Sequence, residues 1–319
     1  MKFVEKLGLN MEFCRGQGYD GAGNMAGRVS GAAARIQANN KNAIYVHCGS
    51  HILNLCIASS SQMQLVRNMM DNVHVTSELF NNSPKRFDLL RQKIKAMLPQ
   101  ARHCHLIDVC RTRWVSRIDG LGVFIEIYSA IVASLEEISN NVGGTWNVES
   151  RTKASGINHA IVTFQFAVCL IIISRCLEVT RPLTKQLQSA SSDAGAARAK
   201  IDLLYLILDN MRTEIDTKHN VWYNEATVIS EAVGTVPAKP RTAGRQMHRE
   251  NVSAESTSQY FKRTISIPFL DHLLNQIHAR FPKTNLDTMD ALFAMPNSVL
   301  TNSEWLVGFS RFAKIQARI

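Results

Sequence analysis

One carboxylate stands out as a residue that could do chemistry. Asp20 lies in the glycine-rich stretch CRGQGYDGAGNMAGRVSGAAARI, residues 14–36, and the next acid along the chain is Asp71. The ordinary charges between these two acids are all positive and come from Arg28, Arg35, Lys41 and Arg67. An acid beside bases suits an oxygen ligand for Mg²⁺ that faces a phosphodiester. The alternative is structural, because a side-chain oxygen of Asp20 could cap the following helix or fix the turn.

The glycines around Asp20 imitate a nucleotide-binding loop. Gly16, Gly18 and Gly21 match the G-x-G-x-x-G pattern of dinucleotide sites. Such a site needs an acid about 20 residues further on to hold the ribose hydroxyls, and this stretch has none. No Gly-Lys-Ser/Thr follows either, which excludes a Walker loop. We therefore interpret the stretch as a turn that carries one acid.

Cys48 and His51 have the C-x-x-H spacing of half a zinc site. The other Cys/His cluster is RHCHLIDVC, residues 102–110, which offers no second pair with matching spacing. The interpretation we favour is that Cys48 is buried on a strand and that a hydrogen bond holds His51.

A second basic segment could bind nucleic acid. CRTRWVSR, residues 110–117, joins three arginines to one tryptophan: Arg111, Arg113, Arg117 and Trp114. Guanidinium groups and an indole suit a nucleic-acid backbone and an unstacked base. Equally, the tryptophan could pack among helices while the arginines stay solvated. The stretch PAKPRTAGRQMHR, residues 237–249, leaves the same choice between a loop that tracks phosphates and a solvated linker.

The composition favours an acidic partner. The 319 residues carry a net charge of +10 and give a pI of about 9.4, so nucleic acid is the first candidate, although a basic surface alone has the same composition. Seven cysteines without paired spacing indicate a reducing compartment, nucleus or cytoplasm. The most apolar run, residues 160–174, is shorter than the roughly 20 residues of a membrane span, and we expect no membrane partner.

The elements that must position these residues change in type along the chain. Apolar spacing predicts a helix over 22–36, a buried strand over 43–48 and a further helix from Ser50. Later helices are predicted over 65–80, 87–98, 117–138, 157–179, 194–216 and 268–281. The expected fold is α+β and mostly α. Its expected domains are an α/β part over 1–62, an all-helical part over 63–234, a basic loop or linker over 235–259 and a helical C-terminal segment over 260–319.

Four blocks together resemble hAT-superfamily transposases. They are the stretch at 14–36, AIYVHCGSHILNLC at 43–56, RTRWVSR at 111–117, and PRTAGRQMHRENV with YFKRTISIPFLDHLLNQIHARF between 240 and 281. Within the superfamily they resemble the transposase-derived proteins grouped with MYM-type zinc-finger proteins and the repressor of the protein-kinase inhibitor. The resemblance covers most of the chain and implies an RNase H-like α/β core, partial here, interrupted by a large all-helical insertion domain.

The resemblance also implies roles for single residues. Asp20 takes the place of the second acid in a D-D-E triad, which in an intact member binds Mg²⁺ or Mn²⁺ to cut and join DNA. Cys48 and His51 match a motif beside the active site, and Trp114 matches the tryptophan that helps to handle the transposon end.

Other parts of the family pattern are not recognised in this sequence. The only acids before residue 14 are Glu5 and Glu12, in a context unlike that of the first triad acid. The tail TNSEWLVGFS resembles the block of the third acid only loosely, so Glu304 is not assigned to the triad. The dimerisation segment and the N-terminal zinc finger are not recognised either.

These patterns lead to one expectation and three alternatives. We expect a chain truncated at both ends that keeps one of three catalytic acids, has no cofactor of its own, and cuts no DNA because one carboxylate cannot hold two metal ions. We expect it to act in the nucleus and to bind DNA or protein, using Arg28, Arg35 and the Arg-Trp segment. The alternatives are a fragment of an active DDE transposase, a transposon-derived transcriptional regulator, and an unstable relic.

Overall fold

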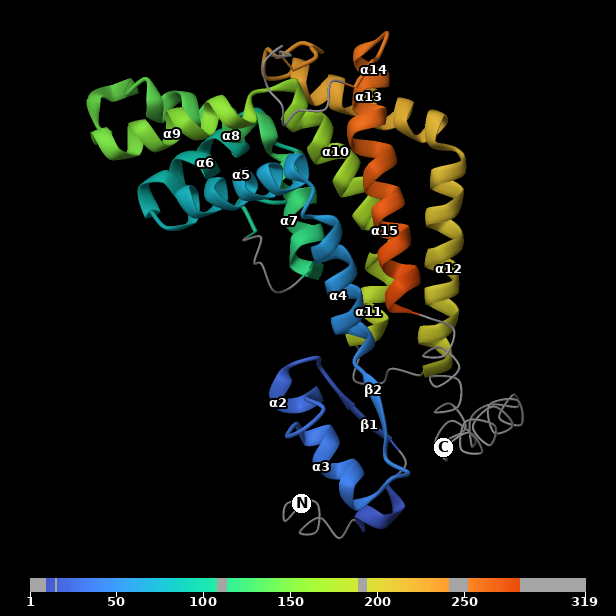
Figure 1. Cartoon of the computed structure of the whole chain (residues 1–319). Helices are drawn as coiled ribbons and strands as arrows, with labels where there is room; N and C mark the ends of the chain where they lie inside the picture. Colours follow the sequence, from blue (N-terminus) through green and yellow to red (C-terminus); the bar gives the residue numbers. More distant parts are fainter. Residues whose placement is uncertain (1–9, 15, 108–113, 189–193, 241–251, 282–319) are drawn as a thin grey trace, which may run out of the picture. The chain divides into compact units, whose positions relative to one another are not determined.

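Helices dominate the structure. The computed structural model describes residues 10–14, 16–107, 114–188, 194–240 and 252–281, which contain two short strands and many helices (Figure 1). The expected α+β, mostly α class is confirmed. The chain divides into two units, one from Met1–Cys56, Pro182–Leu206 and Asn275–Ile319, the other from Ile57–Arg181 and Ile207–Leu274. Helices α4 (Gly49–Ser60), α11 (Arg181–Gln188), α12 (Ala194–Thr213) and α15 (Ile267–Arg280) contribute residues to both units.

The first unit holds the strands. Its elements are η1 (Met11–Phe13), β1 (Gly16–Tyr19), α2 (Gly23–Ala26), α3 (Ala32–Asn39) and β2 (Ile44–His47), with parts of α4, α11, α12 and α15. The predicted strand over 43–48 and the helix that follows it are confirmed by β2 and α4. The predicted helix start at Pro268 is wrong, because the helical turns of residues 257–266 lead directly into α15 and place this proline inside a continuous helical segment.

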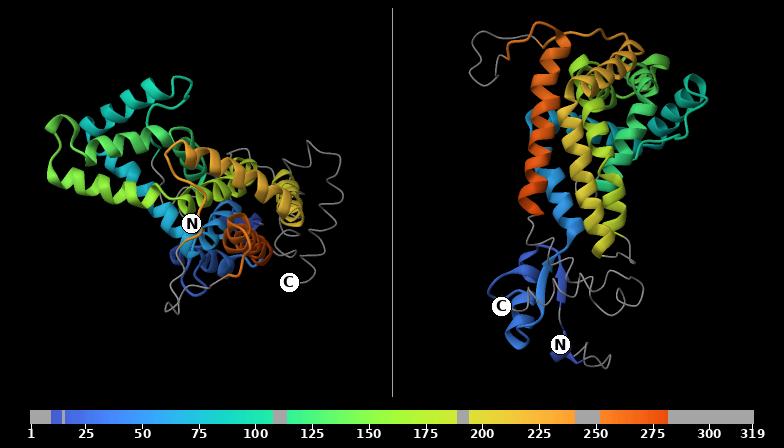
Figure 2. Two further views of the ribbon diagram at one scale, coloured as in Figure 1. Left: turned by 90° about the horizontal axis from the view of Figure 1, so that it is seen from above. Right: turned by 90° about the vertical axis from the view of Figure 1, so that its right-hand side faces the viewer.

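The second unit is helical. Its elements are α5 (Gln64–Asn81), α6 (Pro84–Met97), α7 (Trp114–Glu126), α8 (Tyr128–Ser139), η2 (Val142–Gly144), α9 (Val148–Ile161), α10 (Phe164–Glu178), α13 (Ile215–Glu231), α14 (Thr257–Phe261) and the π-helical turn η3 (Lys262–Ser266). Helix α8 packs against α9 and α6, and α10 packs against α13, α7 and α5 (Figures 1 and 2).

The two strands pair in parallel, with Gly16 opposite Ile44 and Tyr19 opposite His47. Gln17 is buried on β1, and its side-chain amide donates hydrogen bonds to the carbonyl oxygens of Ala33 (3.2 Å) and Ala43 (3.0 Å). A buried amide needs such partners to offset its loss of hydration. These bonds tie β1 to α3 and to the residue that precedes β2.

The single helix predicted over 22–36 is wrong, because the structure has two helices, α2 and α3, separated by a turn. Glycines explain the break. The Cα of Gly31 lies so close to the preceding turn that an added Cβ would come within 2.5 Å of Gly27 N, 2.6 Å of Gly27 O and 2.9 Å of Met25 O. The glycine-rich sequence therefore serves close backbone approach at this turn.

Alanine substitutions at Gly31 and at Gly23 should have different effects on stability. Gly31→Ala is expected to lower the free energy of unfolding by about 1–3 kcal/mol, because backbone atoms must move to accept the methyl group. Gly23→Ala in α2 is the matched control, since nothing lies within 4 Å of its Cβ position. It should be neutral or stabilising by about 0.5–1 kcal/mol. Denaturant unfolding of both variants measures the difference, and equal destabilisation would contradict the turn geometry.

Two other predicted helices are each broken into a bent pair. The prediction over 117–138 becomes α7 and α8, which bend by 70°, and the prediction over 157–179 becomes α9 and α10, which bend by 71°. At the second bend the Thr163 hydroxyl accepts a hydrogen bond from the Phe166 N–H at 3.2 Å. This N-cap starts α10 afresh, and periodicity alone does not reveal it, because the apolar pattern continues through both bends.

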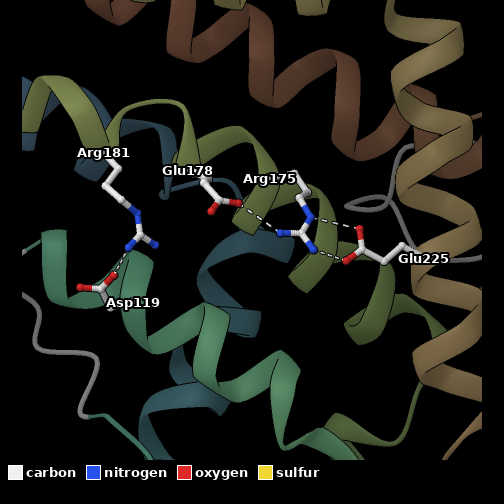
Figure 3. A network of polar contacts seen from close by, with 5 residues as sticks. All are labelled: Asp119, Arg175, Glu178, Arg181 and Glu225. Atoms are coloured by element: carbon white, nitrogen blue, oxygen red, sulfur yellow. Dashed lines mark hydrogen bonds and ion pairs between the residues drawn. The ribbon is translucent and has the colours of Figure 1, made fainter. Parts of the chain in front are cut away.

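Ion pairs fasten α10 and the start of α11 to their neighbours (Figure 3). Arg175 in α10 binds both carboxylate oxygens of Glu225 in α13 and also bonds to Glu178 at 3.1 Å. Arg181 pairs with Asp119 in α7. The fork-shaped contact between Arg175 and Glu225 fixes the rotation of α10 against α13 as well as adding attraction.

No single helix in the described part of the chain is long and apolar enough to cross a membrane. Two bent pairs, α7 with α8 and α9 with α10, meet these length and hydropathy criteria only when the two helices of a pair are counted together.

Candidate functional site

The strand pair brings Asp20 and the Cys48 segment to one edge. Asp20 directly follows β1, and Cys48 directly follows β2. Because the strands are parallel and in register, their carboxyl ends meet at the same edge. The Cys48 N–H donates a hydrogen bond to the Tyr19 carbonyl at 2.9 Å, which continues the pairing to the last residue before the acid.

A row of rings lies along this edge. The centroids of Tyr19 and Tyr45 are 6.4 Å apart, those of Tyr45 and His47 6.5 Å, and those of His47 and His51 5.2 Å. The Tyr45 hydroxyl donates a hydrogen bond to the Asp20 carbonyl at 3.3 Å. Burial raises the pKa of Tyr45, and the negative charge of Asp20 adds to the rise. The edge therefore combines one carboxylate, two phenols and two imidazoles.

Asp20 itself fixes the turn. Its Oδ1 accepts a hydrogen bond from the Ala22 N–H at 3.2 Å, just before α2. This contact is the turn-fixing role that the sequence allows as the alternative to a role of Asp20 as a metal ligand. The side chain is exposed, so the contact with Ala22 leaves it accessible to solvent.

Gly21 lets the His47 ring approach the backbone closely. A Cβ on Gly21 would lie 2.9 Å from His47 Cε1 and 3.0 Å from Nε2. His47 Nε2 is shielded from solvent and has no hydrogen-bond partner among the residues that the structure describes. Burial lowers the pKa of His47, and the charges of His51 and Arg280 lower it further while that of Asp20 raises it. His47 is therefore held mainly as a neutral imidazole.

Cys48 and His51 do not form a zinc site with other described residues. The predicted burial of Cys48 on a strand is wrong, because Cys48 is half-buried and directly follows β2, while the His51 ring stacks on His47. Within residues 10–107, 114–188, 194–240 and 252–281, apart from Arg15, no group of three His, Cys, Asp or Glu side chains could hold a metal ion.

The predicted basic residues have different outcomes. Arg28 lies in the turn between α2 and α3, and Arg35 lies on α3; both are exposed. Arg111 and Arg113 lie outside the described residues, as do Glu5, Glu304 and residues 241–251 of the basic loop. Trp114 and Arg117 belong to α7, but their side chains are outside the description.

Sequence reasoning missed Tyr45, His47 and Arg280. Tyr45 and His47 are two residues apart on β2, so alternation places them on one face of the strand. That spacing was a usable signal. Arg280 comes from the end of α15, more than 200 residues away in sequence, and only the fold brings its charge near His47.

Comparisons with known proteins find relatives but no family model. The chain is 27% identical over 297 residues to a human protein named "52 kDa repressor of the inhibitor of the protein kinase", and 26% identical over 298 residues to the mouse protein of that name. Each alignment covers 92% of this chain and 39% of the relative. The chain thus spans about two-fifths of the length of the curated relatives it matches.

No family model matches the chain, and no solved structure matches it. The predicted likeness to the repressor of the protein-kinase inhibitor is confirmed by the two relatives.

Proposed function

We propose that this chain is part of a transposase-derived regulator that binds nucleic acid and does not cut it. The two relatives are named as a repressor, and the four sequence blocks resemble hAT-superfamily transposases. A repressor of this origin would act in the nucleus and would use inherited nucleic-acid contacts. The net charge of +10 supplies the attraction to phosphates.

The observation that carries the second half of the proposal, that the chain does not cut nucleic acid, is the composition of the Asp20 edge. Asp20 lies at the end of a parallel strand beside tyrosine and histidine rings. Two-metal phosphoryl transfer needs several converging oxygen ligands, and no metal-holding group of three side chains occurs in the described part of the chain. These residues do not fit the Mg²⁺ or Mn²⁺ pair of an intact transposase, and we derive no catalytic step at Asp20.

The fold supports the proposed origin. The parallel pair β1–β2 with α2 and α3 between its strands would belong to an RNase H-like core, and the helices from α5 onward would be the insertion. Cys48 and His51 follow β2 at the same edge as Asp20, which agrees with a motif beside a former active site.

A cleavage assay separates this function from that of an active transposase. The purified chain is incubated with labelled duplex DNA and either Mg²⁺ or Mn²⁺, beside an Asp20→Ala variant. We expect no nicks or strand transfer with either protein. We expect equal or slightly tighter DNA binding by the variant, because a carboxylate repels phosphates. Metal-dependent cleavage that Asp20→Ala abolishes would identify a working fragment of a DDE transposase.

A further inference from the structure

Half of the chain's net charge lies in one short segment of the helical unit. Residues 84–105, PKRFDLLRQKIKAMLPQARHCH, contain six Lys or Arg residues and one acid, a net charge of +5 out of +10. Most of this segment is helix α6, which was not among the candidate binding residues from the sequence. This share of the net positive charge is larger than a segment of that length would carry if the charge were spread evenly along the chain.

Helix α6 is amphipathic, and its cations lie on the side away from the core. Its buried residues are Leu89, Leu90 and Ile94, and the helix packs against α5 and α8. Lys85, Arg91 and Lys95 are exposed, and we call these three residues the α6 basic face. The helical repeat places them within one side of the helix.

Two other cations of α6 serve the fold. Lys93 pairs with Glu137 of α8 at 2.8 Å. Arg86 donates hydrogen bonds to the Leu79 carbonyl at 2.6 Å and to the Ser150 hydroxyl at 3.0 Å. These contacts account for Lys93 and Arg86, so neither is counted in the α6 basic face.

The cations of the α6 basic face are not neutralised. In the described part of the chain no carboxylate lies within ion-pairing distance of Arg91 or Lys95. The Lys85 ammonium donates a hydrogen bond to the Thr145 carbonyl at 2.6 Å and lies 4.1 Å from the centre of the Trp146 ring. Both contacts hold this ammonium in place and leave its positive charge intact.

The spacing fits a phosphate backbone better than a protein partner. Ten residues separate Lys85 from Lys95, about 15 Å along the helix axis, and phosphates on one strand of a duplex repeat about every 3.4 Å along its axis. The exposed residues between the cations are one acid, Asp88, which forms no ion pair with Lys85 or Arg91, and Gln92, with Ala96 beside Lys95, so the face keeps an excess of positive charge. A protein interface of ordinary strength needs apolar or aromatic anchors at its centre, and this face offers none between its cations.

We propose that the α6 basic face binds the phosphate backbone of nucleic acid, an inference that rests on the proposed nucleic-acid binding. Each cation would neutralise one phosphate and release the counterion condensed there. The affinity for DNA would then depend on salt through these side chains, whatever the base sequence.

The test compares two double variants that lose equal charge. Arg91→Gln with Lys95→Gln removes two cations of the α6 basic face. Lys153→Gln with Lys218→Gln is the matched control, because both lysines lie on helices of the same unit and already pair with Glu149 and Glu214. Binding of a labelled mixed-sequence duplex is measured by fluorescence anisotropy over a range of salt concentrations, after circular dichroism has shown intact folding.

The face variant should lower the slope of log K against log salt by about 1.8 and weaken binding about 10- to 100-fold at 0.1 M salt. The control should change the slope by less than half of that amount. If both variants lose affinity for the duplex equally, or if neither loses affinity, the α6 basic face is not the binding surface. Binding by the unaltered chain would still support the proposed function. Failure of the unaltered chain to bind would overturn both proposals. If poly-L-glutamate binds as tightly as DNA and with the same dependence on Arg91 and Lys95, the partner is an acidic protein and the nucleic-acid assignment is wrong.

Discussion

Replacing Phe166 by alanine is expected to lower the free energy of unfolding by about 3–5 kcal/mol. Phe166 is 4% exposed, and its ring centre lies 5.9 Å from that of Phe124 and 6.2 Å from that of Tyr128. The three rings join α10, α7 and α8 at the bends that break the predicted helices. Truncation removes apolar contact and leaves a cavity, and the two costs add.

The measurement is denaturant unfolding followed by circular dichroism. Val228→Ala is the control, because Val228 is 66% exposed on α13 and should change stability by less than about 0.5 kcal/mol. Similar small losses in both variants would show that the aromatic cluster is not a core of the helical unit.

Acidification from pH 7.5 to pH 5 is expected to remove about 2 kcal/mol of stability through His219 alone. His219 on α13 is fully buried. Its Nε2 lies 2.9 Å from the Ser258 carbonyl oxygen, and its Nδ1 lies 2.8 Å from the Ser266 hydroxyl. A carbonyl only accepts, so Nε2 carries the proton and Nδ1 accepts from Ser266. The neutral ring thereby joins α13 to α14 and η3.

Burial lowers the pKa of His219 to about 4, and the positive charge of Lys262 lowers it further, while the Ser258 hydrogen bond and Asp216 oppose the shift. The unfolded chain takes up the proton near pH 6.5, before the folded chain does. Stability is therefore complete above about pH 6.5 and falls as the pH drops toward about 4.

His219→Gln tests this assignment, because it keeps an amide donor and acceptor but does not titrate. The variant should be less stable at neutral pH and should show a shallower loss of stability between pH 7.5 and pH 5. Burial also lowers the pKa values of His47 and His278, so part of the pH dependence remains in both proteins. Identical pH dependence would mean that His219 does not carry the effect.

The sequence predicts regular elements well where the local pattern and the fold agree. Strand β2 and helix α4 follow from the apolar run at 43–48 and the helical spacing after it. Helices α5, α6 and α15 follow from amphipathic spacing. The breaks at Ile127 and Thr163 depend on packing on both sides of a bend, and a continuous apolar pattern hides them. The turn at Gly27 and Gly31 depends on contact between backbone atoms, which periodicity does not record.

Only part of the candidate site could be predicted from the sequence. Parallel pairing of the strands places Asp20 and the Cys48 segment at one edge, a relation that the alternating pattern of turn, helix and strand already favours. The approach of the Arg280 charge to His47 depends on long-range folding and could not be predicted. The cations of α6 are visible in the sequence as a charge run, but only the folded contacts of Lys93 and Arg86 show which of them remain free for a ligand.

The central claim is that the chain binds nucleic acid through phosphates. The most direct measurement is the affinity of the unaltered chain for a short duplex at about 50 mM and about 200 mM salt. If three phosphates are neutralised, as the α6 basic face allows, the affinity should fall about 40-fold over this range. Absence of binding at the lower concentration, or an affinity that does not change with salt, would contradict the claim.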